Sequence, residues 1–243
     1  MFVLAIASEF ELRRVRQLIA VERLDVHGGR EFVFGTMAGR DVCLVKTGVG
    51  RKNAAAAARK ICSEIKPELV IIAGAAGALD PGLSLGAVVV VESVVRENNT
   101  EKIFCPDEET RRVAALLCSA GMKAGTGRCC QVRTFMHRAV DKRALFEKIA
   151  AHSVDMESAA FAAEFQRVGV PFVNMRVVSD RAACDTADME TLVRLRYRRG
   201  KMAAALYLLR HPRELMRTIQ FYRGMAIADK RIAEAVSALI ASM

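Results

Sequence analysis

Carboxylate side chains occur in three segments of the sequence where they could take part in chemistry. Val154-Asp-Met-Glu-Ser158 holds two acids at the start of an alanine-rich stretch, Val177-Val-Ser-Asp180 ends an apolar run, and Ser8-Glu-Phe-Glu11 follows the apolar N-terminal residues. Asp155 fits the ordinary role of an acid at a helix N-terminus, which is worth about 0.3–1 kcal/mol. Glu157 needs no such role and could bind sugar hydroxyls. Asp180 fits a helix cap or turn as well as a general acid.

Two glycine segments could bring the backbone close to a ligand. Thr47-Gly-Val-Gly50 and Gly74-Ala-Ala-Gly77 each follow an apolar run, and glycine permits close backbone approach. Neither continues as the Gly-Lys-Ser/Thr of a phosphate-binding loop, and neither forms the dinucleotide fingerprint GxGxxG. Each segment therefore fits a tight turn as well as a ligand contact.

Short apolar runs that alternate with helical patterns must position these residues. Buried strands are predicted over residues 2–7, 69–73, 85–91 and 171–178, and a pair of strands over 30–34 and 40–46, with Gly35 and Gly39 framing their turn. Helices are predicted over residues 9–20, 53–65, 108–120, 141–151 and 155–168.

This alternation predicts an α/β fold: one domain over residues 1–190, with a mainly parallel or mixed twisted sheet flanked by helices. Ligands bind at the carboxyl ends of strands in such sheets. The segments 8–11, 74–77 and 179–180 all follow predicted strands. We therefore expect them to share one cleft.

The rest of the chain, residues 191–243, is predicted to be a helical basic C-terminal extension packed on that domain, with a break near His211-Pro212. Residues 201–209 and 227–243 carry apolar stripes at helical spacing, which usually face a core. Basic side chains crowd the segment: Arg194, Arg196, Arg198, Arg199, Lys201, Arg210, Arg213, Arg217 and Arg223. They fit a solvated face or a peripheral contact with an anionic membrane, and both interpretations stay open.

Composition narrows the function classes. The chain of 243 residues has a formal net charge of +10, but it has no Trp, three Tyr and no interleaving of basic and aromatic residues, which argues against nucleic-acid binding. Seven cysteines without a CxxC pair and four scattered histidines predict neither a zinc site nor disulfides. We expect no cofactor. The N-terminal apolar run lacks a basic region and a cleavage site, so a cytoplasmic protein is expected.

Taken together and in order, these motifs resemble the methylthioadenosine/S-adenosylhomocysteine nucleosidase branch of the purine nucleoside phosphorylase superfamily. The resemblance runs from residue 1 to about residue 185 and rests on Val154-Asp-Met-Glu157, the segment 171–180, the loop 73–78, Thr47-Gly-Val-Gly50 and the N-terminal Glu-x-Glu. Each motif is weak alone, but their shared order is specific.

The resemblance implies a purine nucleosidase that cleaves an N-glycosidic bond. In this scheme Asp180 protonates N7 of the purine, Glu157 binds the ribose hydroxyls and Glu11 positions the attacking water. Phe135 and Met136 would contact the base. The full set of implied substrate-binding residues is Ala76, Gly77, Phe135, Met136, Met156, Arg176 and Ser179. The resemblance also implies a homodimer or a larger homo-oligomer.

The nucleophile and the substrate are predicted from segments in which this sequence differs from other branches of the superfamily. The run Val70-Ile-Ile-Ala-Gly74 lacks the arginine with which phosphorylases hold phosphate, so water is favoured. Arg51 could still reach the site, and a phosphorylase, like a nucleoside-binding protein without turnover, stays open. The short polar stretch 93–100 and the basic extension look more like the hopanoid-associated branch, whose expected substrate is adenosylhopane. A 5′-substituted adenosine is therefore expected, with futalosine hydrolase as another relative.

Overall fold

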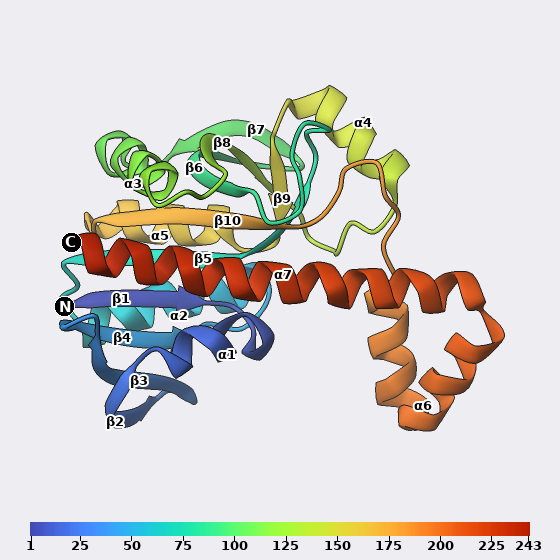
Figure 1. Ribbon diagram of the computed structural model, residues 1–243, viewed down its shortest axis with the longest axis horizontal. Helices are drawn as coiled ribbons and strands as arrows, with labels where there is room; N and C mark the ends of the chain where they lie inside the picture. Colours follow the sequence, from blue (N-terminus) through green and yellow to red (C-terminus); the bar gives the residue numbers. More distant parts are fainter.

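The computed structural model describes residues 1–98 and 101–243 completely; Asn99 and Thr100 are described only as part of a strand, and their side chains lie outside the described residues. Ten strands form one sheet (Figure 1). They are β1 Phe2–Ile6, β2 Ala20–His27, β3 Arg30–Met37, β4 Arg40–Lys46, β5 Leu69–Ala78, β6 Val88–Arg96, β7 Asn99–Phe104, β8 Ala124–Gln131, β9 Ser153–Asp155 and β10 Phe172–Asp180.

Helices cover both faces of this sheet. The helices of the chain are α1 Glu9–Gln17, α2 Arg51–Glu64, α3 Asp107–Ser119, α4 Ala139–Ile149, α5 Ser158–Val168, α6 Met189–Arg210 and α7 Pro212–Ser242. The helices α1, α3 and α7 pack on one face, and α2 and α5 pack on the other. Two apolar layers result, which are built from alternate side chains of the same strands.

The sheet is mixed and partly closed. Its order is β10-β6-β8-β9-β5-β1-β4-β3-β2, and β10 pairs with β5 as well as with β6, so that five strands form a ring. In the ring β5 and β10 are parallel neighbours. Their carboxyl ends therefore lie side by side, and the predicted α/β architecture with a mixed sheet and flanking helices is confirmed.

Several predicted boundaries were wrong, and pairing between strands explains most of them. The predicted helix 9–20 ends at Gln17, because residues from Ala20 onward pair with β3 as β2. Residues 74–77 are not a loop: β5 continues through them because β10 supplies hydrogen bonds as far as Gly77. The predicted helix 155–168 begins at Ser158, since Asp155 pairs with β8 as the last residue of β9. The turn at Gly39 is present, but Gly35 lies within β3.

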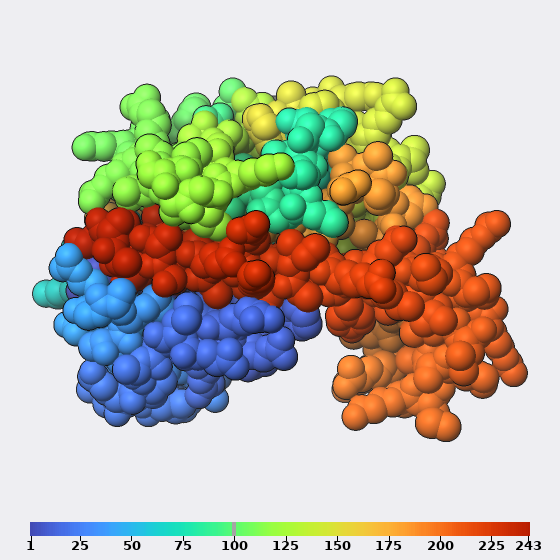
Figure 2. All heavy atoms as spheres, viewed as in Figure 1, coloured from blue at the N-terminus to red at the C-terminus, as the bar shows by residue number. Residues whose placement is uncertain are grey.

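The last two helices play different parts. The second part of α7 is buried against the sheet through Ile232, Val236, Leu239 and Ile240. By contrast, α6 and the first part of α7 project from the body and form a separate lobe in Figures 1 and 2. We call residues 189–223 the arm. Among the described residues, none of the helices is long and apolar enough to cross a membrane. The division of the chain at residue 190 stays a prediction.

Candidate active site

The parallel pair β5 and β10 brings the first group of predicted residues together. In their register Arg176 lies opposite Gly74, and Asp180 lies opposite Gly77. A Cβ atom at Gly74 would lie 2.5 Å from Arg176 Nη1, closer than real side chains allow. Glycine in this strand therefore makes room for the large charged side chain of its neighbour.

Asp180 is a buried carboxyl group at the end of β10, with 6% of its surface exposed. The Ser179 hydroxyl lies 2.9 Å from Asp180 Oδ1 and 3.2 Å from the carbonyl oxygen of Ala76. The Lys142 ammonium donates a short hydrogen bond to Asp180 Oδ2. The predicted general acid thus lies against the amino group of a buried lysine.

Lys142 was not among the predicted site residues. Its side chain is fully buried, and besides Asp180 it donates to the carbonyl oxygens of Arg181, at 3.1 Å, and Cys184, at 3.2 Å. One signal in the sequence could have identified it: Lys142 lies on the same face of α4 as the buried residues Leu145 and Ile149. A lysine on an apolar stripe needs a buried partner.

Glu11 is held at the amino end of α1 by a capping box. Its Oε2 atom accepts hydrogen bonds from the backbone N–H of Ser8, at 2.9 Å, and from the Ser8 hydroxyl, at 2.6 Å. The pattern Ser-x-x-Glu in the sequence encodes this arrangement. The other oxygen, Oε1, accepts from the backbone N–H of Ala75 in β5, at 2.7 Å. The capping box and the Ala75 N–H therefore hold the Glu11 carboxylate next to the backbone of β5.

Glu157 is a buried carboxyl group at the amino end of α5. Its Oε1 atom accepts a hydrogen bond of 2.6 Å from the backbone N–H of Gly50, so the segment 47–50 does reach the site. Burial, followed by the negative charge of Asp155, raises the pKa of Glu157 to about 7. The charge of Arg176 and the Gly50 N–H act in the opposite direction.

Arg176 is buried beside Asp155 and Glu157, and these acids balance its positive charge. Its Nη2 atom lies 2.8 Å from Asp155 Oδ2 as an ion pair, and its Nε atom donates to the Ser158 hydroxyl oxygen at 3.1 Å. The expected capping by Asp155 is also present, because its carboxylate accepts from the backbone N–H of Ser158. Burial opposes the charge of Arg176, but Asp155 and Glu157 outweigh it and raise its pKa.

A small cavity of about 30 Å³ opens at Asp180. Five predicted residues line it, together with Val132, Val154 and Asp155: they are Gly77, Phe135, Met136, Met156 and Asp180. Ala76 lies in β5, and Arg176 and Ser179 lie in β10. All three are buried, and none of them lines the cavity. The cavity has about the volume of one water molecule, so it is smaller than a purine base.

Aromatic rings connect this cavity to α7. Phe135 packs edge-on against Phe221, with ring centroids 5.6 Å apart. Phe221 contacts Tyr222, and Tyr222 reaches Phe10, next to Glu11. We call these four rings the aromatic wall. The base of the arm therefore lies next to both the Asp180 cavity and Glu11.

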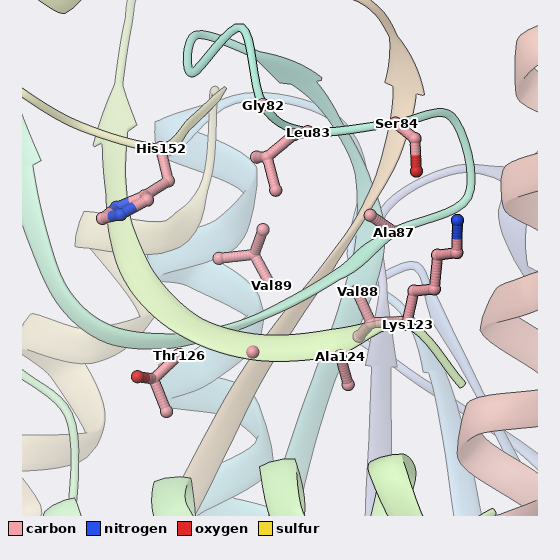
Figure 3. A pocket seen from close by; sticks show the side chains of 11 residues that line it. Gly82, Leu83, Ser84, Ala87, Val88, Val89, Lys123, Ala124, Thr126 and His152 are labelled. Atoms are coloured by element: carbon pink, nitrogen blue, oxygen red, sulfur yellow. The ribbon is translucent and has the colours of Figure 1, made fainter. Parts of the chain in front are cut away.

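A larger cavity, of about 410 Å³, lies elsewhere (Figure 3). It is formed by the loop before β6, the start of β6 and β8, and His152. Figure 3 shows Leu83 and Val89 between the imidazole of His152 and the polar ends of Ser84 and Lys123. No predicted site residue lines it, and no group of side chains in the described part of the chain could hold a metal ion.

Known proteins resemble this chain in sequence and in fold. A model of the phosphorylase superfamily matches residues 2–210. The 5′-methylthioadenosine/S-adenosylhomocysteine nucleosidases of Marinomonas sp. (strain MWYL1) and Lysinibacillus sphaericus (strain C3-41) are each 32% identical over 195 residues, which cover 72% of this chain and 84% of theirs.

Among solved structures, the same kind of nucleosidase from Neisseria meningitidis, in complex with methylthio-immucillin-A, gives a TM-score of 0.80 at 20% identity, over 100% of this chain and 99% of that one. Futalosine hydrolase of Helicobacter pylori strain 26695 gives a TM-score of 0.80 at 16% identity, over 100% and 97%. These two likenesses concern the fold. Because the matched model spans most of the sequence and the two curated relatives share about a third of their residues with it, the chain belongs to the phosphorylase superfamily.

Proposed function

We propose that the protein hydrolyses the N-glycosidic bond of a 5′-substituted adenosine and releases adenine. The observation that carries this proposal is that Glu11, Glu157 and Asp180 are buried, each 6% exposed, around the neighbouring strands β5 and β10. Relatives at 32% identity are named nucleosidases, which supports the same class of reaction.

The arrangement suits the chemistry of glycosidic cleavage. A purine leaves more easily when its N7 is protonated, and the carboxyl group of Asp180 lies in the cavity wall formed with Phe135 and Met136. Positive charge then develops on the ribose, and ionised Glu157 and Glu11 would stabilise it. Met156 would pack on the sugar, and Glu11 would orient the attacking water. Ala76, Gly77 and Ser179 would form the floor of the pocket for the sugar and the base.

Water is proposed as the nucleophile because the arginines near the site have other partners or other positions. Arg176 is paired with Asp155, Arg30 donates to the carbonyl oxygen of Thr47, and Arg51 is exposed. A phosphate dianion needs arginine or backbone donors that are free to bind it. Phosphorolysis remains the alternative, and its signature is a strict requirement for phosphate.

The 5′ substituent is proposed to be apolar. The aromatic wall runs from Phe135, in the Asp180 cavity, along α7 to Phe10, next to Glu11. Such rings favour apolar ligand surface over charged groups. Adenosylhopane has a substituent of this kind, and methylthioadenosine has a smaller one. Futalosine has a larger polar substituent and should be a poorer substrate.

The test measures adenine or other free base from adenosine, inosine, methylthioadenosine, futalosine and adenosylhopane in buffer without phosphate. We expect base release from the 5′-substituted adenosines, and Asp180→Asn should lower kcat by about 10²–10⁴-fold, which is the usual contribution of general acid catalysis. Asp107→Asn, at an exposed position of α3, is the matched control. Release only after phosphate is added would select a phosphorylase, and binding without release would select a nucleoside-binding protein.

The arm is the surface that we propose to contact an anionic membrane. It holds nine basic and two acidic side chains, a formal +7 of the chain's +10. It also exposes large apolar residues: Val193, Tyr197, Met202, Leu206, Leu209, Met216, Ile219 and Tyr222. Basic and apolar side chains together are typical of helices that lie in a membrane interface. The homo-oligomer and the cytoplasmic location implied by the sequence remain predictions.

A further inference from the structure

We propose that Lys142 holds the proton which Asp180 passes to the purine. This inference rests on the proposed function and assigns a role within it to a side chain that the reaction scheme does not yet use. Lys142 is a positioning residue in this scheme, because it reaches the substrate only through Asp180.

The geometry around Lys142 is that of a charged ammonium in a fixed position. An ammonium has three N–H donors, and Nζ has three acceptors: Asp180 Oδ2 and the carbonyl oxygens of Arg181 and Cys184. The side chain is fully buried, so every donor is used without water. The amino group of Lys142 is therefore held in contact with Asp180.

The other charged groups near this pair have partners of their own. Asp155, in β9, pairs with Arg176, and Asp185 pairs with Arg217 of α7 and accepts from the backbone N–H of Ala139. Within α4 and the residue before it, Arg138 pairs with Asp141. Of the other titratable groups in the adjoining loops, Arg133 pairs with Glu97 and Asp188 accepts from the backbone N–H of Thr191. The rest are Arg181, Cys184 and His137, and Lys142 contacts the backbone carbonyl oxygens of the first two.

A bound purine changes the balance between the two forms of the pair. Asp180 lines a small cavity, so a base bound against its carboxyl group shields the pair from solvent. A pair of opposite charges in a dry pocket loses solvation that a neutral amine and a neutral acid do not need. Substrate binding thus favours transfer of the proton from Nζ to the carboxylate.

The proton balance is closed within the site. The Nζ–H bond breaks and an O–H bond forms on Asp180, which leaves Lys142 as a neutral amine. The proton then moves to N7 while the electron pair of the glycosidic bond goes to N9, and adenine leaves neutral. Water adds to the ribose carbon and gives its proton to Glu11, which releases it to solvent. After adenine departs, Lys142 regains a proton from solvent through Asp180.

A simpler role would be to neutralise Asp180 and hold it in place. Arginine distinguishes the two roles, because a guanidinium keeps its charge and does not give up its proton in proteins. Lys142→Arg preserves a pure charge partner and abolishes a proton donor. Lys142→Met removes both the charge and the proton, and Asp180 must then take its proton directly from solvent.

The experiment measures kcat, KM, their pH profiles and thermal unfolding for the wild type, Lys142→Arg and Lys142→Met, with methylthioadenosine as substrate and the variant Asp180→Asn for comparison. We expect Lys142→Arg to lower kcat by about 10²–10⁴-fold, the value of general acid catalysis, with little change in KM. For Lys142→Met the rate relative to wild type should fall as pH rises, because Asp180 then depends on solvent for its proton.

Lys142→Met keeps the test valid if arginine cannot be accommodated and Lys142→Arg does not fold. Wild-type kcat in Lys142→Arg would overturn the inference and leave the proposed function intact. A loss in Lys142→Met by the same factor at every pH would also overturn it, since a purely structural role acts in that way. No base release by the wild-type enzyme would instead overturn the proposed function, and this inference with it.

Discussion

Glu157 is the carboxyl group whose ionisation should be visible in the reaction rate. Burial, with the help of Asp155, raises its pKa to about 7. A neutral carboxyl group neither stabilises a cationic ribose nor accepts two hydrogen bonds from its hydroxyls as strongly as a carboxylate does. We therefore expect the active form of the free enzyme to be the one in which Glu157 has lost its proton.

We accordingly expect kcat/KM to rise as pH increases through about 7, since protonation of Glu157 below that pH removes its negative charge. The measurement is a pH profile of kcat/KM for adenine release. Glu157→Gln should lower kcat/KM and abolish this rise, whereas Glu108→Gln, an exposed acid in α3, should keep it. A wild-type profile that stays level across pH 7 would contradict the assignment.

Individual site residues differed in how far the sequence could reveal them. Glu11, Glu157 and Asp180 could be predicted, because each is an acid that follows a recognisable apolar or motif-bearing segment. Lys142 could not be assigned a partner, since its contact with Asp180 joins residues 38 positions apart. The roles assigned to these residues remain predictions until the variants are measured.

At the scale of elements, hydrophobic pattern predicted the strands that are buried on both faces. Residues in β1 and β10 are buried throughout, and such runs are plain in the sequence. The strands β7, β8 and β9 were not predicted, because their sequences are polar or rich in glycine, or only three residues long. Their conformation depends on hydrogen bonds to neighbouring strands, which local sequence does not show.

The contact between α7 and β10 depends on a glycine. At Gly224, an added Cβ atom would lie 1.9 Å from the carbonyl oxygen of Ser179. Backbone atoms cannot move aside without displacing the strand or the helix. Gly224 therefore allows α7 to pack directly behind Ser179 and Asp180.

We expect Gly224→Ala to lower the free energy of unfolding by about 1–3 kcal/mol, the usual cost of overpacking. We also expect kcat to fall by about 10²-fold if Asp180 moves by about 1 Å. Denaturant unfolding and steady-state kinetics measure the two effects. Gly125→Ala is the matched control, because no heavy atom lies within 4 Å of a Cβ atom at that position. Equal effects of the two substitutions would contradict the proposed packing role.

At the scale of the whole molecule, α7 links the core, the candidate site and the arm. Its second part is buried with the sheet and its middle packs on Ser179. Its first part carries exposed basic and apolar residues and lies in the projecting arm (Figure 1). Removal of all residues after Tyr197 would therefore delete core side chains as well as the arm. A test of membrane contact requires point substitutions that leave α7 in place.

Three exposed apolar residues of the arm offer that test. Tyr197, Met202 and Leu209 are 92%, 85% and 73% exposed, so replacing all three with Glu should leave the fold intact. We expect the wild type to sediment with vesicles of phosphatidylcholine and phosphatidylglycerol and to be released by salt, because each basic residue near an anionic surface contributes about 1 kcal/mol that salt screens. The triple variant should remain in solution.

The control is Val26→Glu, an exposed apolar position in β2 outside the arm, which should sediment as the wild type does. Vesicles of phosphatidylcholine alone should bind weakly, since they lack the negative charge that the arm complements. If the triple variant sediments as strongly as the wild type, the arm is not the membrane contact. If it instead changes the oligomeric state on size-exclusion chromatography while the wild type ignores vesicles, the exposed side chains serve contact between copies of the chain.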